Sequence, residues 1–305
     1  MFELTAGGHD GDGGARVRAV VSARGASLRA LRVDGVELIC STLDPTPPLS
    51  AGTVLVPWPN RVDGASWVHD GRRLELDVTE QAAGNAIHGL LADHDYTLLE
   101  RGESWLELAA PVAGHAGYPF ELQTELRYEL SQNGITATHR IRNSGDAPAP
   151  VALGVHPYLR VGDWPVDELR FSLPANAILP LDERHFPGER RSVRGAAESL
   201  RAGRRVAEIV SHACFTELER SDGRLHAELI APDGRGARLW ADPDFGYVQI
   251  YVTPDFPTDA GYTTAIAIEP MTAPPNALRS GEGLRWLAPG EAWELSWGIQ
   301  AIQAL

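Results

Sequence analysis

Short runs of alternating apolar and polar residues, separated by Gly, Pro, Asn and Asp, dominate this 305-residue chain. In the clearest run, Glu121–Leu130, the residues of one face recur at every second position, as in a half-buried antiparallel strand. An Asn133-Gly134 turn follows, and Asn-Gly tolerates the positive φ of a tight hairpin. Because this pattern repeats along the chain, we predict an all-β fold, a large antiparallel β-sandwich with few short helices.

Other segments carry the same signals more weakly. Strands are predicted over Ala15–Val21, Leu74–Val78, Ser104–Ala109, Ile135–Ile141, Leu225–Ile230 and Ala237–Trp240, with turns at Asp222-Gly223 and Asp233-Gly234. The best helix candidate is Gly195–Val210, which Gly203 interrupts. The glycines between positions 7 and 14 indicate a hairpin loop rather than a phosphate-binding loop. No linker or repeat marks a boundary, so we predict a single domain over residues 1–305.

Composition excludes several classes of function. The 41 acidic and 27 basic residues give a formal charge of −14, which disfavours a nucleic-acid partner and an anionic membrane surface. Every basic residue is Arg, so no lysine can form a Schiff base or serve a P-loop. No run approaches the ~18 apolar residues of a membrane span, and the first residues lack a signal-peptide pattern. We therefore expect a soluble cytoplasmic protein, with Cys40 and Cys214 as buried reduced thiols.

Two titratable residues end apolar runs. Glu269 follows the run Ala265–Ile268 and precedes Pro270, which cannot continue a strand ladder. Such a carboxylate lies at the mouth of a cavity or pairs with an arginine, because burial without a partner costs several kcal/mol. His156 ends the run Val151–Val155, and a neighbouring carboxylate could hold it protonated as a general acid. A hydrogen-bonded structural histidine is the alternative.

Further polar residues lie beside Gly and Pro. Asn60 and Arg61 follow two prolines on a stiff loop, where the guanidinium could bind sugar hydroxyls, bind a carboxylate or brace the loop. His88 precedes a glycine and is equally ambiguous. His88, Asp93 and His94 could be imagined as metal ligands, but no flanking helix fixes them on one face. We predict no metal and no cofactor.

Five segments carry a resemblance that no single one would establish. They are Pro57–Gly64, Asn85–Gly89, Gly154–Tyr158, Val248–Thr253, and Ala267–Thr272 followed by Pro275-Asn276-Ala277. In this order they resemble the aldose 1-epimerase (galactose mutarotase) family, with its P-x-P-N-R-I-x-x-G, N-x-x-H-G, Q-x-Y-T and E-P-x-T…P-x-A motifs. The third segment is similar to the one that holds the second histidine of that family.

The resemblance implies a β-supersandwich and a cofactor-free isomerase that interconverts the α and β anomers of a free aldohexose. Glu269 would take the proton from the anomeric hydroxyl and His156 would protonate the ring oxygen, with the roles reversed on ring closure. Arg61 and His88 would bind and orient the sugar. Asn60 and Gln249 would support them. An ionised glutamate and a protonated histidine would stabilise each other's charge.

One position departs from the family pattern. His212 stands where the family often carries an Asp that binds sugar hydroxyls, and an imidazole lacks the bidentate acceptor geometry of a carboxylate. We expect His212 to contact the substrate. Asp182, Glu217 and Glu219 are the carboxylates that could substitute.

Two alternatives remain open at this level. A mutarotase for phosphorylated hexoses would need an arginine cluster beside the pocket, and Arg190-Arg191 and Arg204-Arg205 are the candidates, although we expect both pairs to lie in surface segments. The second alternative is a sugar-binding or regulatory protein that keeps the fold without turnover. In each case we expect a small-molecule sugar as the partner, and a monomer or homodimer.

Overall fold

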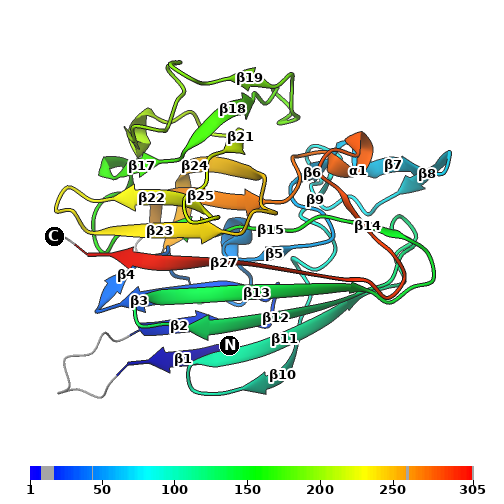
Figure 1. Ribbon diagram of the computed structural model, residues 1–305, viewed down its shortest axis with the longest axis horizontal. Coiled ribbons are helices and arrows are strands. Elements are labelled where there is room, and N and C mark those ends of the chain that lie inside the picture. Colours follow the sequence, from blue (N-terminus) through cyan, green and yellow to red (C-terminus); the bar gives the residue numbers. More distant parts are fainter. Residues whose placement is uncertain (8–16, 43, 259–260, 304–305) are drawn as a thin grey trace.

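A computed structural model describes residues 1–7, 17–42, 44–258 and 261–303 (Figure 1). Two large antiparallel sheets dominate it, which confirms the predicted all-β sandwich. The larger sheet runs through β10 (Thr97–Arg101), β11 (Trp105–Val112), β12 (Leu122–Leu130), β13 (Gly134–Asn143), β27 (Ala292–Ile302), β23 (Gly236–Ala241), β22 (Leu225–Ile230), β17 (Arg170–Ser172) and β20 (Arg204–Arg205). The second runs through β19 (Arg191–Ser192), β18 (Ala175–Leu179), β21 (Ala213–Leu218), β24 (Tyr247–Thr258), β25 (Gly261–Met271), β15 (Gly154–Val155) and β5 (Val54–Leu55).

Smaller elements complete the described chain. A four-stranded sheet of β1 (Phe2–Ala6), β2 (Val17–Val21), β3 (Leu28–Val33) and β4 (Val36–Glu37) contacts β12 and β13. Three two-stranded ribbons are β6 (Arg61–Val62) with β9 (Ala86–Ile87), β7 (Ser66–His69) with β8 (Arg72–Glu75), and β14 (Ala149–Val151) with β26 (Arg285–Leu287). The strand β16 (Tyr158–Leu159) pairs with β25. The helices are short: α1 (Ala277–Ser280), η1 (Pro48–Ser50), η2 (Asp63–Ala65), η3 (Val166–Glu168) and η4 (Val206–Glu208).

The strand β12 follows the predicted alternation. Its burial switches at every residue, with Leu122, Thr124 and Leu126 buried and the residues between them exposed. The hairpin that follows is also confirmed, because Leu130 pairs with Ile135 across the Asn-Gly turn. The predicted turn at Asp233-Gly234 likewise joins β22 to β23. The period-two pattern of this segment therefore predicted both the strand and its buried face correctly.

Three sequence expectations about local structure were wrong. The segment Gly195–Val210 is not a helix, since it contains β20 and one 3₁₀ turn, and Gly203 has a left-handed φ of 74°. The strand expected over Leu74–Val78 is Arg72–Glu75 instead, because it pairs with β7 around the turn at Gly71. β25 continues through Pro270 to Met271, since proline removes one N–H donor but keeps the backbone extended. Ala15-Arg16 and the loop expected at the first glycines lie outside the described residues.

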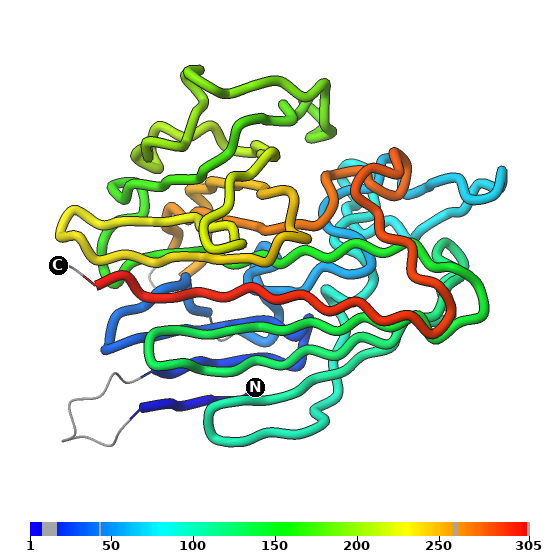
Figure 2. Tube along the Cα trace, in the orientation of Figure 1, coloured from blue at the N-terminus to red at the C-terminus, as the bar shows by residue number. Residues whose placement is uncertain are grey.

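The strand β25 is buried on both faces from Ala265 to Met271. Ile266 and Ile268 point into the main hydrophobic core, which also contains side chains of the larger sheet. Ala265 and Ala267 belong to a second apolar cluster with Tyr158 and Phe256. In Figure 2 the chain after β25 turns into α1 beside the segments that contain β6 and β7, which α1 contacts. This connection brings the end of β25 to the Asn60-Arg61 loop.

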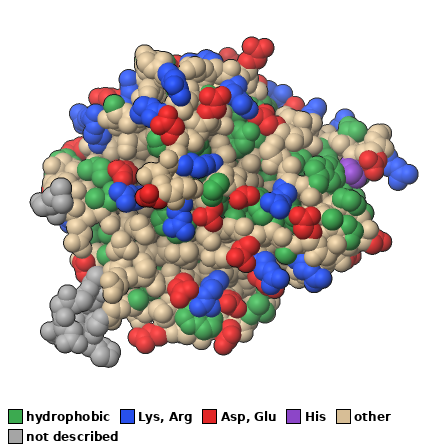
Figure 3. Space-filling model, in the orientation of Figure 1, with side chains coloured by type: hydrophobic (Ala, Val, Ile, Leu, Met, Phe, Trp, Pro, Cys, Tyr) green, Lys and Arg blue, Asp and Glu red, His purple; other side chains and the backbone are tan. Residues whose placement is uncertain are grey.

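The surface carries mixed charge. Acidic and basic side chains are interspersed over the face shown in Figure 3, and many are joined in exposed ion pairs, such as Arg32 with Glu37. Cys40 and Cys214 are both buried and unbonded, as expected. No helix among the described residues is long and apolar enough to span a membrane.

Candidate active site

The sheet register places an acid and a base opposite each other. β25 pairs with β15 at Met271–Gly154 and with β16 at Ala267–Tyr158. In an antiparallel pair, the residue number rises along one strand as it falls along the other. His156, midway between Gly154 and Tyr158, therefore lies opposite Glu269, midway between Met271 and Ala267. The imidazole Nε2 is 3.5 Å from the Oε1 of Glu269.

Gln249 completes a row of three polar side chains. It pairs with Glu269 from the other neighbouring strand, β24, so the carboxyl group has an imidazole on one side and an amide on the other. Directly opposed residues have Cβ atoms only ~5 Å apart. All three side chains are almost completely buried, with Glu269 2%, Gln249 2% and His156 5% exposed. We refer to these three residues and His88 as the floor of the site.

Burial shifts both titratable members of this row toward their neutral forms. It raises the pKa of Glu269 to about 8, although the positive charge of Arg61 opposes the shift. It lowers the pKa of His156 to about 4. The expectation of an ionised glutamate beside a protonated histidine therefore does not describe the unliganded site, because burial outweighs the mutual attraction. Between these two values the pair still holds one proton in total.

The ribbon β6–β9 supplies the second wall. Arg61 pairs with Ile87, and the next residues along, Asn60 and His88, are joined by a hydrogen bond from the His88 N–H to the Asn60 carbonyl. Both have left-handed φ values, 56° and 64°, a conformation that costs energy and is common at functional sites. Gly89 permits the close approach, since a Cβ there would lie 2.2 Å from the carbonyl oxygen of Val56.

Arg61 is held in place by a carboxylate that the sequence did not reveal. Its Nη2 donates to Oε1 of Glu80 at 2.7 Å and its Nε donates to Oε2 at 3.0 Å, and Asn85 Nδ2 donates to Oε2 at 2.8 Å. These bonds keep the pKa of Glu80 below its usual value despite partial burial. A bidentate pair of this kind fixes the plane of the guanidinium.

The remaining wall is more open. His212 and Tyr251 are half-buried, and their rings contact each other with centroids 4.4 Å apart. His185 also stacks on His212, with ring centroids 4.1 Å apart. We refer to Arg61, His212 and Tyr251 as the rim of the site.

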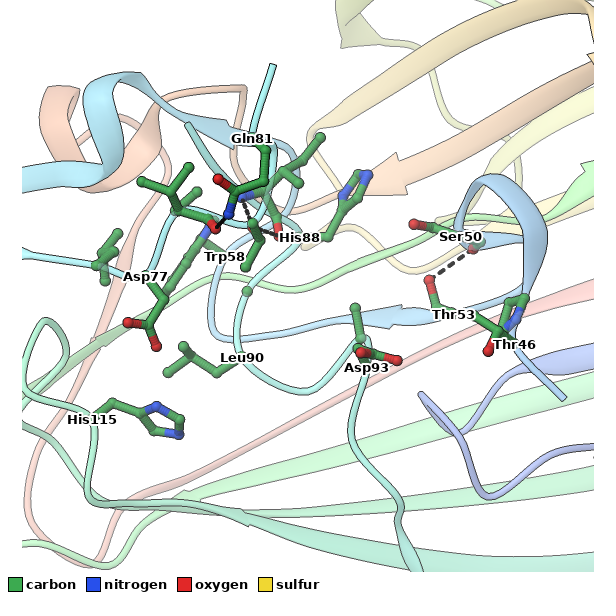
Figure 4. A pocket seen from close by; sticks show the side chains of 18 residues that line it. Thr46, Ser50, Thr53, Trp58, Asp77, Gln81, His88, Leu90, Asp93 and His115 are labelled. Atoms are coloured by element: carbon green, nitrogen blue, oxygen red, sulfur yellow. Dashed lines mark hydrogen bonds between the residues drawn. The ribbon is translucent and has the colours of Figure 1, made fainter. Parts of the chain in front are cut away.

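Floor and rim enclose one cavity of about 240 Å³. It is lined by Leu49, Ser50, Asn60, Arg61, Ile87, His88, His156, His212, Gln249, Tyr251 and Glu269. Four side-chain atoms of the lining are buried without a hydrogen-bond partner among the described residues: Oε2 of Glu269, Oε1 of Gln249, Nδ1 of His88 and Nδ1 of His156. Buried polar atoms are nearly always paired, so these atoms are available to a polar ligand in the cavity. A larger neighbouring cavity of about 540 Å³ shares Ser50, Ile87 and His88 with it (Figure 4).

All seven residues selected from the sequence line this cavity: Asn60, Arg61, His88, His156, His212, Gln249 and Glu269. Tyr251 was missed, although its position two residues after Gln249 places it on the same strand face. Glu80 and His185 were missed as well, and no local signal identifies them.

Several alternatives from the sequence do not line the cavity. None of Asp182, Glu217 and Glu219 lies on its wall, and Asp182 instead accepts hydrogen bonds from the backbone N–H groups of Arg184 and Phe186. The arginines at 190, 191, 204 and 205 are also absent from the lining, in which Arg61 is the one basic side chain besides the histidines. Within the described part of the chain, no three His, Cys, Asp or Glu side chains could hold a metal ion, so His88, Asp93 and His94 form no such group.

Comparison with known families identifies the family of the chain. The family model for aldose 1-epimerase matches residues 11–300, nearly the whole chain. The chain belongs to the aldose 1-epimerase family. A curated relative, the uncharacterized protein YihR of Escherichia coli (strain K12), is 29% identical over 283 residues, which cover 92% of this chain and 89% of that protein.

Solved structures with this fold include several members and homologues of the aldose 1-epimerase family. The GalM/aldose epimerase homologue from C. elegans aligns with a TM-score of 0.82 at 16% identity, covering 100% of both chains. A putative aldose 1-epimerase from Escherichia coli K12 aligns with a TM-score of 0.79 at 20% identity, again over 100% of both chains. The galactose 1-epimerase from Lactobacillus acidophilus NCFM gives 0.77 at 19% identity, covering 100% of this chain and 99% of that one. At these identities the likeness establishes the fold.

Proposed function

We propose that this protein is an aldose 1-epimerase that interconverts the α and β anomers of a free aldohexose. The observation that carries the proposal is the opposition of His156 and Glu269 on one buried strand face, with Nε2 and Oε1 3.5 Å apart. Mutarotation needs one group that removes the proton of the anomeric hydroxyl and one that protonates the ring oxygen. A pair holding a single proton supplies one acid and one base.

In the proposed mechanism Glu269 is the base at the anomeric hydroxyl and His156 is the acid at the ring oxygen. Burial places the resting proton on Glu269, so the active form requires its transfer to His156. The transfer changes neither the net charge nor the number of protons in the site. The charge of Arg61 favours the ionised carboxylate. After the ring opens and the aldehyde rotates, closure uses the same groups in reverse.

Arg61 and His88 would hold the sugar hydroxyls. Arg61 presents a guanidinium fixed by Glu80, and burial together with the nearby Arg61 and His156 holds the pKa of His88 well below its usual value. A neutral imidazole can both donate and accept a hydrogen bond, which suits a hydroxyl group. Asn60 and Gln249 would position these contacts. The absence of an arginine cluster from the cavity lining gives no support to a phosphorylated substrate.

Anomer-resolved NMR on freshly dissolved glucose and galactose tests the proposal. We expect the wild-type protein to accelerate the α–β exchange, and Glu269→Gln and His156→Ala each to lower kcat by roughly 10²–10⁴-fold. Matched controls are Glu294→Gln and His94→Ala, which change exposed residues outside the cavity. Sugar binding without any acceleration by the wild type would instead identify a non-catalytic sugar-binding protein.

A further inference from the structure

The hydrogen bonds around His212 determine which of its nitrogens carries the proton. Ser211 Oγ lies 2.6 Å from the carbonyl oxygen of Val252 and 3.1 Å from Nδ1 of His212. A carbonyl oxygen only accepts, so the single hydroxyl proton of Ser211 is donated to Val252. The same Oγ must then accept from His212, which places the imidazole proton on Nδ1. Nε2 is left with a lone pair.

The surroundings of His212 keep this ring neutral. It packs against Tyr251 of β24 and His185 of the loop between β18 and β19, and it lies near the guanidinium of Arg61. Burial and the charges of His185 and Arg61 lower its pKa to about 4. The pKa of His185 is lowered as well. A positive charge on either imidazole would therefore lie near the guanidinium of Arg61 and would be poorly hydrated, so both rings favour the neutral form.

We propose that Ser211 is a positioning residue that fixes His212 as a neutral acceptor, and that Nε2 of His212 accepts a hydrogen bond from one hydroxyl of the substrate. This inference rests on the proposed sugar substrate. A carboxylate at this position could accept from two neighbouring hydroxyls at once, whereas Nε2 accepts from one. The protein would consequently select for the position of a single hydroxyl on this side of the sugar. It would discriminate less against changes at the adjacent hydroxyl.

The first test measures the tautomer directly and needs no activity. Side-chain ¹⁵N NMR of the unliganded protein at pH 7 should show His212 protonated at Nδ1. Ser211→Ala should shift it toward a mixture of tautomers, while Ser131→Ala, in the exposed turn after β12, should leave it unchanged. A wild-type His212 protonated at Nε2 would overturn the proposal even if the enzyme proves to be a mutarotase.

The second test pairs protein variants with deoxy sugars. His212→Phe keeps an aromatic ring against Tyr251 and His185 but removes both nitrogens, whereas His212→Gln can place an acceptor near the position of Nε2. We expect His212→Phe to raise KM about 3- to 10-fold, the usual worth of one hydrogen bond, with kcat changed less than about twofold. Ser211→Ala should raise KM less, and His212→Gln should recover part of the loss.

The deoxy sugars identify the hydroxyl. One monodeoxy glucose should bind the wild type more weakly than glucose does. The His212→Phe variant should bind that sugar and glucose equally well, because the hydrogen bond to this hydroxyl is already absent from the variant. Equal losses with both proteins for every sugar would contradict the proposal. Failure of all sugars to exchange would contradict the proposed function and leave the tautomer measurement intact.

Discussion

The floor and the rim of the cavity differ in how they are built. The three central floor residues are at most 5% exposed: Glu269 and Gln249 lie opposite each other on neighbouring strands, and His156 lies opposite Glu269 in the connection between β15 and β16. The rim residues Arg61 and His212 belong to a two-residue ribbon strand and to a loop, and both are partly exposed. Sheet register therefore fixes the three central floor residues, whereas side-chain hydrogen bonds hold Arg61 and His212 of the rim.

In the proposed mechanism, the two regions have different roles. Burial moves the pKa values of Glu269 and His156 strongly, which is what proton transfer near neutral pH requires. The rim offers fixed hydrogen-bond groups and aromatic rings at the entrance, which is what recognition of a sugar requires. Changes to the floor should therefore act on kcat, and changes to the rim on KM.

The largest expected effect comes from removing both members of the floor pair. If Glu269 and His156 act as one unit, the Glu269→Gln, His156→Ala double variant should be about as slow as the slower single variant, roughly 10²–10⁴-fold below wild type. Exchange rates from NMR saturation transfer would measure this. A double variant whose loss equals the product of the two single losses would show that the two groups act independently.

The next largest effect should come from the rim. Arg61→Ala removes a charged hydrogen-bond donor and should raise KM by about 10- to 100-fold, with a smaller change in kcat. Glu80→Gln is the matched variant, since it keeps the guanidinium but weakens the bidentate pair that orients it, and it should raise KM less. An Arg61→Ala enzyme that loses mainly kcat would place Arg61 with the floor.

The decrease of kcat/KM at alkaline pH should depend on the floor residues alone. The pair loses its one proton as the pH rises through about 8 and gains a second as it falls through about 4. We expect kcat/KM to fall about tenfold per pH unit beyond each limit. His212→Phe should leave the alkaline limit in place. An alkaline limit that moves in this variant would tie the rim to proton transfer.

The smallest expected effect is on stability. The pKa of Glu269 is higher in the folded protein than its ordinary value of 4.5, so its contribution to stability is complete below pH 4.5 and is lost as the pH rises toward 8. Glu269→Gln should therefore match wild type at pH 5 and exceed its Tm by a few °C at pH 8 to 9. Thermal unfolding followed by circular dichroism measures the difference. Glu294→Gln should show no such pH trend.

The sequence predicted the elements of the floor better than their arrangement. Alternation located β12, and the apolar run before Glu269 indicated a buried strand, because these patterns are local. The opposition of His156 and Glu269 depends on pairing between strands 113 positions apart in sequence, which no local pattern encodes. Only the resemblance to a family indicated that the two side chains meet.

The rim was less accessible to sequence reasoning. Glu80 and His185 act through contacts with Arg61 and His212 from distant loops, and neither occurs in a distinctive motif. The protonation of the floor could not be predicted either, since desolvation depends on the completed packing of both sheets. The expected helix at Gly195–Val210 failed for a related reason, because strand pairing of Arg204 and Arg205 with β17 prevailed over a weak periodicity.

The register that joins His156 to Glu269 also limits how this site can change. Adding or deleting one residue within β25 would invert the phase of the strand, so that Glu269 would enter the main core and Ile268 would face the cavity. Loops at the entrance have no alternation of side-chain direction to preserve, so they can change length without moving His156 away from Glu269. If the proposed mechanism holds, new substrates are accessible by exchanging entrance loops, whereas proton transfer depends on strands of fixed length.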